Sequence, residues 1–386
     1  EITASYLWEP SCQCFVVQQE CGNGTTETGE ECDGRDLEAS ACSSFGFGGG
    51  TLACKPRCTE DDKNCFLPCT FEIKDCQGSP TVYVTNTKSN SVSVIDPITN
   101  KVTTTVKVGE EPRGIAASPD GSTVYVTNFL SDTLSIIDRA TNTVTDTIPV
   151  GDGPVGVAVA PDGNHVYIVN GEDDTVSVIA AASKTLVTTI KVGEEPHEIA
   201  LTPDGEQAYV TNYRNSSVSV LDLKPTPGFK STIFVGSGPN GVAVSPDGKK
   251  VYVVNFGFED DINPGTVSAI DVATGEVTGT VTVEFRPVKI AVSPDSKTAF
   301  VSNSISESVS VIDLDTLTVS RSIPAFSSGL TNPDGVALLG GQRLYVALFG
   351  NEFSNKVQVF SATTPTLFAE IEVGQGPFAI AVAPAL

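Results

Sequence analysis

The sequence predicts an all-β fold, and two observations carry this prediction. From residue 81 onward, short runs rich in β-branched and aromatic residues are separated by turn residues, and no amphipathic helix pattern is present. The same pattern also repeats with a period of about 40–45 residues, and each copy holds four strand-like segments. A period of that length with four short strands is typical of the blades of a β-propeller.

One copy of the repeat shows the four strands in order. Residues 82–86, 91–96 and 102–108 favour β-strands by composition and alternation. Residues 114–117 form a fourth segment, which is small and apolar, as expected where blades crowd around a central axis. The run Ser118-Pro119-Asp120-Gly121 follows and predicts a tight turn, because Pro presets φ and Gly tolerates a positive φ.

The repeat occurs in seven copies, and its first and last parts complete each other. The first copy begins at the aromatic strand and lacks an inner strand, whereas residues 378–383 form an inner strand with no blade of their own. Placing that strand in the blade begun by residues 81–108 gives seven blades and leaves no open edge. The aromatic residues that mark the copies are spaced by 42, 42, 42, 43, 48 and 45 residues and are Tyr83, Tyr125, Tyr167, Tyr209, Tyr252, Phe300 and Tyr345.

Several segments return in nearly every copy: Tyr-Val-Thr-Asn, Ser-Val-Ser-Val-Ile-Asp, Val-Gly-x-x-Pro and Ser-Pro-Asp-Gly. Through these segments, which cover about four-fifths of the chain, the sequence resembles the YVTN-family β-propeller repeats. That family is known from bacterial and archaeal surface and surface-layer proteins. The resemblance implies a fold but not an activity, because propellers host many unrelated functions.

The cysteines form a second pattern, because all ten lie in the first fifth of the chain. An even number in a short segment predicts a disulfide framework, whose pairing the sequence leaves open. Zinc binding is the alternative, but no His lies nearby and no tandem Cys-x-x-Cys pair is present. Disulfides in turn predict an oxidising compartment, which is the periplasm, the cell surface or the outside of the cell. Because the sequence begins at Glu1 and shows no signal peptide, we expect it to be the mature form of an exported protein. The predicted disulfide cysteines are Cys12, Cys14, Cys21, Cys32, Cys42, Cys54, Cys58, Cys65, Cys69 and Cys76.

The cysteine-rich segment also carries a resemblance of its own. The runs Cys21-Gly22-Asn23-Gly24 and Gly29-Glu30-Glu31-Cys32-Asp33-Gly34 are similar to short cysteine-rich repeats of secreted bacterial proteins. The resemblance implies a disulfide-linked spacer or docking module that has no catalytic activity of its own. We therefore expect two domains, namely a disulfide-rich module at residues 1–79, with a strand-like segment at residues 2–8, and the seven-bladed propeller at residues 80–386.

The charge of the chain excludes some partners. The sequence holds 47 acidic and 23 basic residues, which gives a formal net charge of −24. Nucleic acid is therefore not an expected partner, because its recognition needs a basic face. No apolar stretch is long enough to span a membrane. Two triplets are weak candidates for glycosylation, at Asn23 and Asn215.

Residues that depart from the repeat are the candidates for function. The aspartates that recur at strand ends and in Pro-Asp turns are expected to bond nearby backbone amides, because a catalytic residue usually breaks a repeat. The two positions after the Pro that opens each inner strand are expected to ring one mouth of a central tunnel. Mixed charge around a cleft indicates a ligand site, with a solvated rim as the alternative. The candidate ligand-binding residues are Arg113, His197, Glu198, Asn240, Lys289 and Asp334.

Insertions are expected on the same face, where loops on a rigid scaffold often carry binding. The insertion of the fifth copy contains Glu259, Asp260 and Asp261, which are candidate oxygen ligands for calcium. A solvated acidic loop is the alternative, because no EF-hand pattern is present. The insertions also place aromatic residues on this face, namely Phe256, Phe258, Phe349 and Phe353.

The sequence offers little support for catalysis. Its only histidines are His165 and His197, and no Gly-x-Ser-x-Gly, Walker or His-Glu-x-x-His motif is present. Haem is not expected, because axial ligands are scarce with two His and no Met. We therefore expect no catalytic residue and no cofactor other than the candidate calcium.

These observations predict a non-enzymatic extracellular or cell-surface protein that works by adhesion or by assembly into a surface layer or filament. Its partners would be proteins, including further copies of itself joined through the strand-like segment at residues 2–8. The alternative is a propeller that binds a ligand or cofactor at the tunnel mouth, either as a receptor for a glycan or small molecule or as a lactonase-like enzyme.

Overall fold

The computed structural model describes residues 5–8, 15–21, 51–55, 67–74, 79–257, 263–325, 331–350, 355–364 and 366–385. These residues fall into two compact units, of which Thr81–Ala383 is the larger. Nearly every described element is a strand, and a single turn of 3-10 helix, η1 (Thr87–Ser89), interrupts the pattern among the described residues.

The smaller unit contains one antiparallel sheet of four strands in the order β1-β2-β4-β3. The predicted N-terminal strand is present as β1, and it pairs with β2 of its own unit, with Trp8 opposite Phe15. Its addition to a sheet of a neighbouring subunit therefore stays a prediction. The strands are β1 (Ser5–Trp8), β2 (Phe15–Cys21), β3 (Thr51–Lys55) and β4 (Leu67–Lys74).

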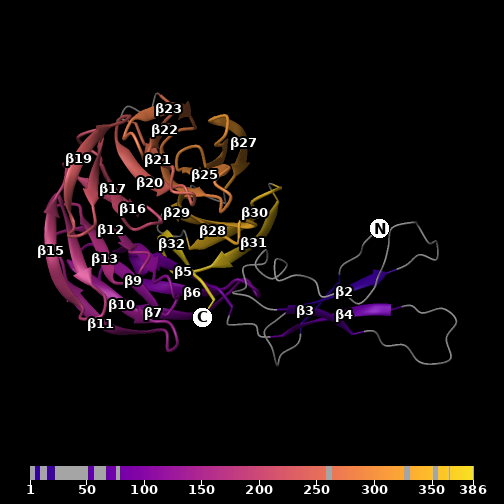
Figure 1. Ribbon diagram of the computed structural model, residues 1–386. Helices are drawn as coiled ribbons and strands as arrows, with labels where there is room; N and C mark the ends of the chain where they lie inside the picture. Colours follow the sequence, from indigo (N-terminus) through magenta and orange to yellow (C-terminus); the bar gives the residue numbers. More distant parts are fainter. Residues whose placement is uncertain are drawn as a thin grey trace, which may run out of the picture. The chain divides into compact units, whose positions relative to one another are not determined.

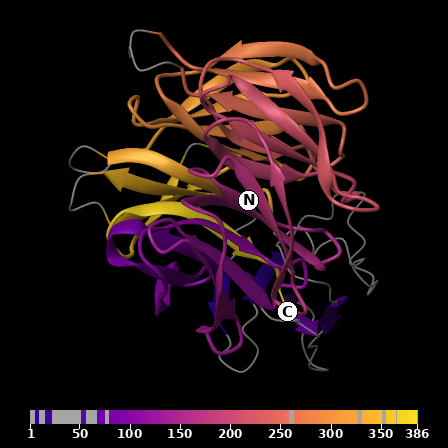
Figure 2. The ribbon, with the colours of Figure 1, turned by 90° about the vertical axis from the view of Figure 1, so that its left-hand side faces the viewer.

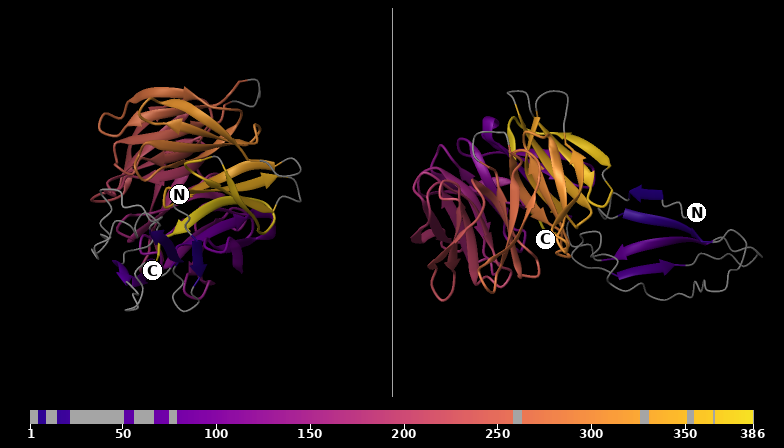
Figure 3. Two further views of the ribbon diagram at one scale, coloured as in Figure 1. Left: turned by 90° about the vertical axis from the view of Figure 1, so that its right-hand side faces the viewer. Right: turned by 90° about the horizontal axis from the view of Figure 1, so that it is seen from above.

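The larger unit is a ring of seven four-stranded antiparallel sheets, which confirms the predicted seven-bladed propeller (Figure 1). Blade 1 is β32-β5-β6-β7, and blades 2 to 7 follow in chain order as β8–β11, β12–β15, β16–β19, β20–β23, β24–β27 and β28–β31. Figure 2 shows the propeller after a quarter turn, and Figure 3 shows it from two further directions.

The ring closes as the sequence predicts, because the last strand completes the first blade. Strand β32 pairs antiparallel with β5, with Ala381 opposite Tyr83 and Ala383 opposite Thr81. The two strands lie side by side in Figure 1, with β32 in yellow and β5 in purple. Closure of this kind leaves no unpaired inner edge between the first and last blades.

The innermost strand of each blade lies at the central channel. The structure begins these strands at or near a proline, two residues earlier than the sequence suggests for residues 114–117, because Pro112 already pairs with Asn128. The inner strands are β8 (Pro112–Ala117), β12 (Pro154–Val159), β16 (Pro196–Leu201), β20 (Pro239–Val244), β24 (Pro287–Val292), β28 (Thr331–Leu339) and β32 (Pro377–Ala383).

The second strand of each blade carries the aromatic marker and is buried on both faces. In β9, for example, five of six residues are buried, which explains the continuous β-branched and aromatic composition. These strands are β5 (Thr81–Asn86), β9 (Thr123–Asn128), β13 (His165–Asn170), β17 (Gln207–Asn212), β21 (Lys250–Asn255), β25 (Thr298–Asn303) and β29 (Arg343–Gly350).

The third strands are buried between neighbouring blades and supply most of the remaining core. Val92 and Val94 of blade 1 belong to the same buried cluster as Val124 and Val126 of blade 2. Blades are thus held together by apolar burial across each interface. The third strands are β6 (Ser91–Asp96), β10 (Thr133–Asp138), β14 (Thr175–Ala180), β18 (Ser217–Asp222), β22 (Thr266–Asp271), β26 (Ser308–Asp313) and β30 (Lys356–Ser361).

The outer strands alternate between exposed and partly buried residues, as expected for sheet edges with one wet face. They are β7 (Lys101–Lys107), β11 (Thr143–Pro149), β15 (Thr185–Lys191), β19 (Gly228–Phe234), β23 (Val277–Thr282), β27 (Thr318–Pro324) and β31 (Leu367–Glu372).

The recurring aspartates serve turns, as the repeat pattern indicates. Asp120 accepts hydrogen bonds from the Ser118 hydroxyl at 2.5 Å and from the Ser122 N–H at 3.0 Å. At a strand end, Asp138 accepts from the N–H and the hydroxyl of Thr141 at 2.8 and 2.7 Å. These bonds favour the charged carboxylate and lower the pKa of both groups.

Candidate functional site

A β-bulge near the start of each inner strand directs two residues toward the central channel. Pro112 pairs with Asn128 and Ile115 pairs with Val126, so two residues of β8 stand opposite one residue of β9. The same shift of register occurs in the other six inner strands. A bulge frees its residues from the regular ladder and re-aims their side chains. The repeat thus places two residues per blade at the mouth of the channel.

The second bulge residue lies where neighbouring blades approach most closely. A Cβ atom on Gly114 would lie 2.1 Å from the backbone oxygen of Val155, and one on Gly335 would lie 2.3 Å from that of Phe378. Such distances do not occur between real atoms, so glycine is the residue that fits at these points of the repeat. Glu198 and Lys289 occupy the same position in blades 4 and 6.

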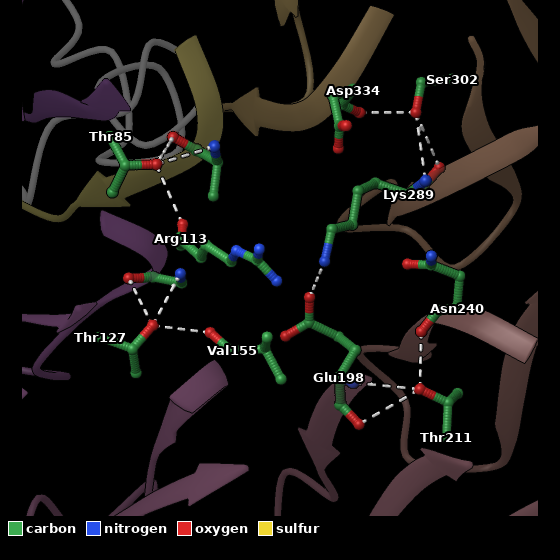
Figure 4. Close-up of polar contacts among 12 residues, drawn as sticks. Thr85, Arg113, Thr127, Val155, Glu198, Thr211, Asn240, Lys289, Ser302 and Asp334 are labelled. Atoms are coloured by element: carbon green, nitrogen blue, oxygen red, sulfur yellow. Dashed lines mark hydrogen bonds and ion pairs between the residues drawn. The ribbon is translucent and has the colours of Figure 1, made fainter. Parts of the chain in front are cut away.

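Hydroxyl groups from the second strands connect the bulges of neighbouring blades (Figure 4). The Thr127 hydroxyl accepts a hydrogen bond from the N–H of Gly114 at 2.8 Å and donates one to the Val155 oxygen in the next blade at 2.7 Å. The Thr of Tyr-Val-Thr-Asn therefore bonds one blade to the next. Equivalent bonds to the following blade come from Thr85, Thr211 and Ser302.

Glu198 and Lys289 form an ion pair across the channel, from β16 in blade 4 to β24 in blade 6. Their side chains are 21% and 17% exposed, so the pair is largely removed from water. In Figure 4 the two side chains extend toward each other from either side of blade 5, and Arg113 faces them from blade 2. The two charged residues that replace glycine at this position of the repeat are thus each other's partners.

Asp334 lies beside this pair and is 8% exposed. Its backbone oxygen accepts a hydrogen bond from the Ser302 hydroxyl at 2.6 Å. Its side-chain Oδ1 makes no hydrogen bond to the described residues. Burial raises the pKa of Asp334 to about 7, although the positive charge of Lys289 opposes this shift. Asp334 is therefore a buried carboxyl group that holds or releases a proton near neutral pH.

Aromatic rings and cations alternate around the mouth. The guanidinium carbon of Arg113 lies 3.4 Å from the centre of the Phe129 ring, and Arg113 also bonds Glu111 at 2.6 Å. Lys289 lies 6.0 Å from the centre of the Phe378 ring. These contacts are within the range of cation–π attraction and fix the positions of the cations. Similar contacts join Lys88 to Phe349 and Arg286 to Phe256.

His197 lies on the same rim and is held by its neighbours. Its ring stacks on Tyr213 with centroids 5.1 Å apart, and its Nε2 lies 3.7 Å from Glu195 Oε1. Burial, followed by the charge of Lys289, lowers the pKa of His197, so the ring is neutral at pH 7.

Glu195 itself has a φ of 50°, in the left-handed region that side chains seldom adopt. The equivalent residues of blades 3 and 5, Gly153 and Gly238, have the same sign of φ without that strain.

These residues enclose three adjoining cavities. The central one has a volume of about 220 Å³ and is lined by Arg113, His197, Asn240, Lys289 and Asp334, among others. A more open cavity of about 500 Å³ shares Arg113 and His197 with it. A smaller one of about 140 Å³ is lined by both Glu198 and Lys289, so the ion pair lies between the central cavity and the channel below.

The structure brings all six predicted ligand-site residues together. Five line the central cavity and Glu198 lines the smaller one next to it. Sequence reasoning missed the aromatic residues Phe129 and Tyr213, which directly follow the Asn of Tyr-Val-Thr-Asn, and that position was the available signal. It also passed over Phe378, which follows the opening Pro of β32. That these residues bind a ligand remains a proposal.

The other predicted sites are not described by the structure. Glu259, Asp260, Asp261 and Asn23 lie outside the described residues, as do seven cysteines. Cys21, Cys54 and Cys69 lie in β2, β3 and β4, and only their backbone is described. Asn215 is exposed, and its glycosylation stays a prediction. Within the described ranges, no group of three or more His, Cys, Asp or Glu could hold a metal ion.

Comparison with known families agrees with this fold. The family model of YNCE-like beta-propellers matches residues 67–164 and 154–255. This match and the seven blades identify the larger unit as a seven-bladed β-propeller of the YVTN type. Among curated proteins, the PE-PGRS family protein PE_PGRS18 of Mycobacterium tuberculosis is 58% identical over 38 residues, which are 10% of this chain and 8% of that protein. So short a segment carries no function to this chain.

Three solved structures share the fold. Hydrazine synthase of Kuenenia stuttgartiensis is 24% identical with a TM-score of 0.64, over 71% of this chain and 90% of that chain. A functionally unknown protein from Desulfotomaculum acetoxidans is 17% identical with a TM-score of 0.69, over 79% and 99%. The dihydro-heme d1 dehydrogenase NirN in complex with DHE is 14% identical with a TM-score of 0.57, over 78% and 74%.

These neighbours contradict the expectation of a protein without enzymatic activity, because two of the three are enzymes. The expectation was wrong because it relied on the absence of linear motifs. A propeller gathers one or two residues from each blade, so its site leaves no local motif in the sequence. Haem ligation has weak support in this chain, since His197 is the one histidine that lines the cavities described here.

In the part of the chain that the structure describes, no helix is long and apolar enough to cross a membrane.

Proposed function

We propose that this propeller binds a small organic molecule at the mouth of its central channel. One observation carries the proposal: the mouth positions of five blades hold five polar or charged residues, and all five line the same cavity of about 220 Å³. The converging residues are Arg113, His197, Asn240, Lys289 and Asp334.

The lining has the chemistry of a ligand site. Polar groups with defined partners alternate with the rings of Phe256, Phe349 and Phe378, and such a mixture fixes the orientation of a bound molecule while its apolar faces are buried. The Glu198–Lys289 pair borders the cavity on its inner side. The enzymes among the structural neighbours support a propeller that binds a substrate or cofactor, and turnover of the ligand is compatible with this site.

The proposal is tested by ligand-observed NMR on the full chain with a mixed library of small organic acids, amines and sugars. We expect that some of these compounds bind the wild-type protein and that Arg113→Gln reduces their binding. Lys107→Gln is the control, because Lys107 is an exposed cation on the outer strand β7. A library without a single binder, or binders that are indifferent to Arg113→Gln, would overturn the proposal.

We also propose that the protein is exported, with its cysteines in disulfides. The even number of ten cysteines, all within residues 12–76, supports this proposal. Alkylation of the native protein followed by mass spectrometry tests it. The expected result is an unmodified chain that takes up alkyl groups only after reduction, whereas alkylation without reduction would show free thiols.

A further inference from the structure

One buried polar atom at the channel mouth lacks a partner within the described structure. Asp334 is 8% exposed, and its Oδ1 makes no hydrogen bond to the described residues. Its carboxyl group lines the central cavity and points into it in Figure 4. A buried acceptor without a donor is costly, by about 1–3 kcal/mol. A ligand that donates a hydrogen bond to Asp334 would remove this cost.

The two cations that line the cavity are already paired with carboxylates of the protein. Lys289 pairs with Glu198, and Arg113 pairs with Glu111. An anionic ligand would therefore have to compete with two existing carboxylates. A cationic ligand would enter beside the positive charges of Arg113 and Lys289, which line the same cavity. An uncharged ligand meets neither penalty.

The remaining lining residues require both donors and acceptors from the ligand. Asn240, Ser304 and Asn332 contribute side-chain groups that donate and accept hydrogen bonds. A hydroxyl group also both donates and accepts hydrogen bonds. Several hydroxyl groups on one small ring can therefore bond these side chains and Asp334. The rings of Phe256 and Phe378 offer flat apolar surfaces to the C–H faces of a sugar ring.

We propose that the ligand of this site is an uncharged pyranose, one of whose hydroxyl groups donates a hydrogen bond to Asp334. The inference rests on the proposed function and narrows it to one class of molecule. The cavity has a volume of about 220 Å³, which equals that of about seven water molecules. This volume suits a single pyranose ring. The pyranose is either a free monosaccharide or the terminal residue of a glycan, since the larger cavity of about 500 Å³ adjoins the site and leaves room for further residues.

Saturation-transfer NMR and calorimetry on the full chain test this inference. The probes are glucose, galactose, mannose and N-acetylglucosamine, with disaccharides that end in each of them, and sodium benzoate and benzylamine serve as charged comparisons. At least one monosaccharide should bind. Asp334→Ala should weaken that binding by about tenfold or more, and the exposed control Asp315→Asn should leave it unchanged.

The outcomes separate the sugar inference from the proposed function. A disaccharide that binds more tightly than its monosaccharide indicates a glycan end, and equal affinities indicate a free sugar. Binding of benzoate or benzylamine without any sugar overturns the inference and leaves a small-molecule site. Failure of every probe to bind overturns both. If Asp334→Ala does not fold, Asn240→Ala carries the same test, and sugar binding that it leaves unchanged overturns the inference.

Discussion

Glu198 and Lys289, which lie 91 positions apart in the sequence, meet across the central channel as an ion pair. Each stands at a bulge position that is glycine in four other blades, at Gly114, Gly156, Gly241 and Gly335. Two departures from one repeat position have thus produced a single structural feature, which lies beside the candidate ligand cavity.

Replacing one partner of this pair should destabilise the propeller more than replacing both partners. Glu198→Gln leaves Lys289 largely buried beside Arg113, and we expect a loss of about 1–3 kcal/mol in the free energy of unfolding. The double variant with Lys289→Gln should lose less than the sum of the two single variants. A double-mutant cycle in urea measures this coupling. Additive losses would show that the pair contributes nothing of its own.

Asp334 should make stability depend on pH. Its pKa is raised from 3.8 to about 7, so between these values the folded protein keeps a proton that the unfolded chain releases. Stability from this group is complete below about pH 4 and is lost as the pH rises through about 7. Arg113 on β8, His197 and Glu198 on β16, and Lys289 on β24 face the same cavities and set this balance.

Replacing Asp334 with Asn should therefore remove this pH dependence. The free energy of unfolding of Asp334→Asn, relative to wild type, should rise by about 2–4 kcal/mol between about pH 4 and about pH 8. Urea unfolding at both pH values measures it, with Asp315→Asn as the exposed control. A constant difference between the two proteins at both pH values would contradict the raised pKa.

The glycine of Val-Gly-x-x-Pro should be intolerant of a side chain. A Cβ atom on Gly109 would lie 2.6 Å from the side-chain carbon of Asn128, whose oxygen accepts the Gly109 N–H at 3.0 Å. Gly109→Ala should lower the free energy of unfolding by about 2 kcal/mol or more. Gly228→Ala is the matched control, because nothing lies within 4 Å of its Cβ, and it should change stability by at most about 0.5 kcal/mol. Similar effects at both positions would refute the argument.

The hydroxyl of Thr127 should contribute to stability through both of its bonds. Thr127→Val keeps the shape but leaves the N–H of Gly114 and the oxygen of Val155 without this partner. A loss of about 1–3 kcal/mol is expected in chemical denaturation. Thr189→Val on the exposed face of β15 should be nearly neutral. A Thr127→Val protein as stable as wild type would mean that water replaces the hydroxyl.

Most of the fold could be predicted from the sequence, because the repeat contains its own turn and strand signals. The Tyr83 strand, the Pro119-Asp120-Gly121 turn and the lone final strand determine the blade and its closure. The start of the inner strand at Pro112 was harder to predict from the sequence, because a bulge breaks the alternation that marks a strand.

The candidate site could be predicted in part. Alignment of the copies found Arg113, His197 and Asp334, because each is a polar or charged residue at a mouth position that varies between the copies. It could not show that Glu198 pairs with Lys289, since the partners come from different blades and only the curvature of the ring brings them together. It also could not show that Asp334 lacks a partner for Oδ1, because that property depends on the packing of several blades.

The pairing of β32 with β5 has a mechanical consequence. Thr81 lies directly opposite Ala383, so the chain enters and leaves the propeller at the same corner of blade 1. A tension applied through these two points pulls the strands apart like a zipper and breaks the hydrogen bonds one at a time, since the bonds of an antiparallel pair run across the strands. The ring should therefore open under load at this seam before any other blade gives way.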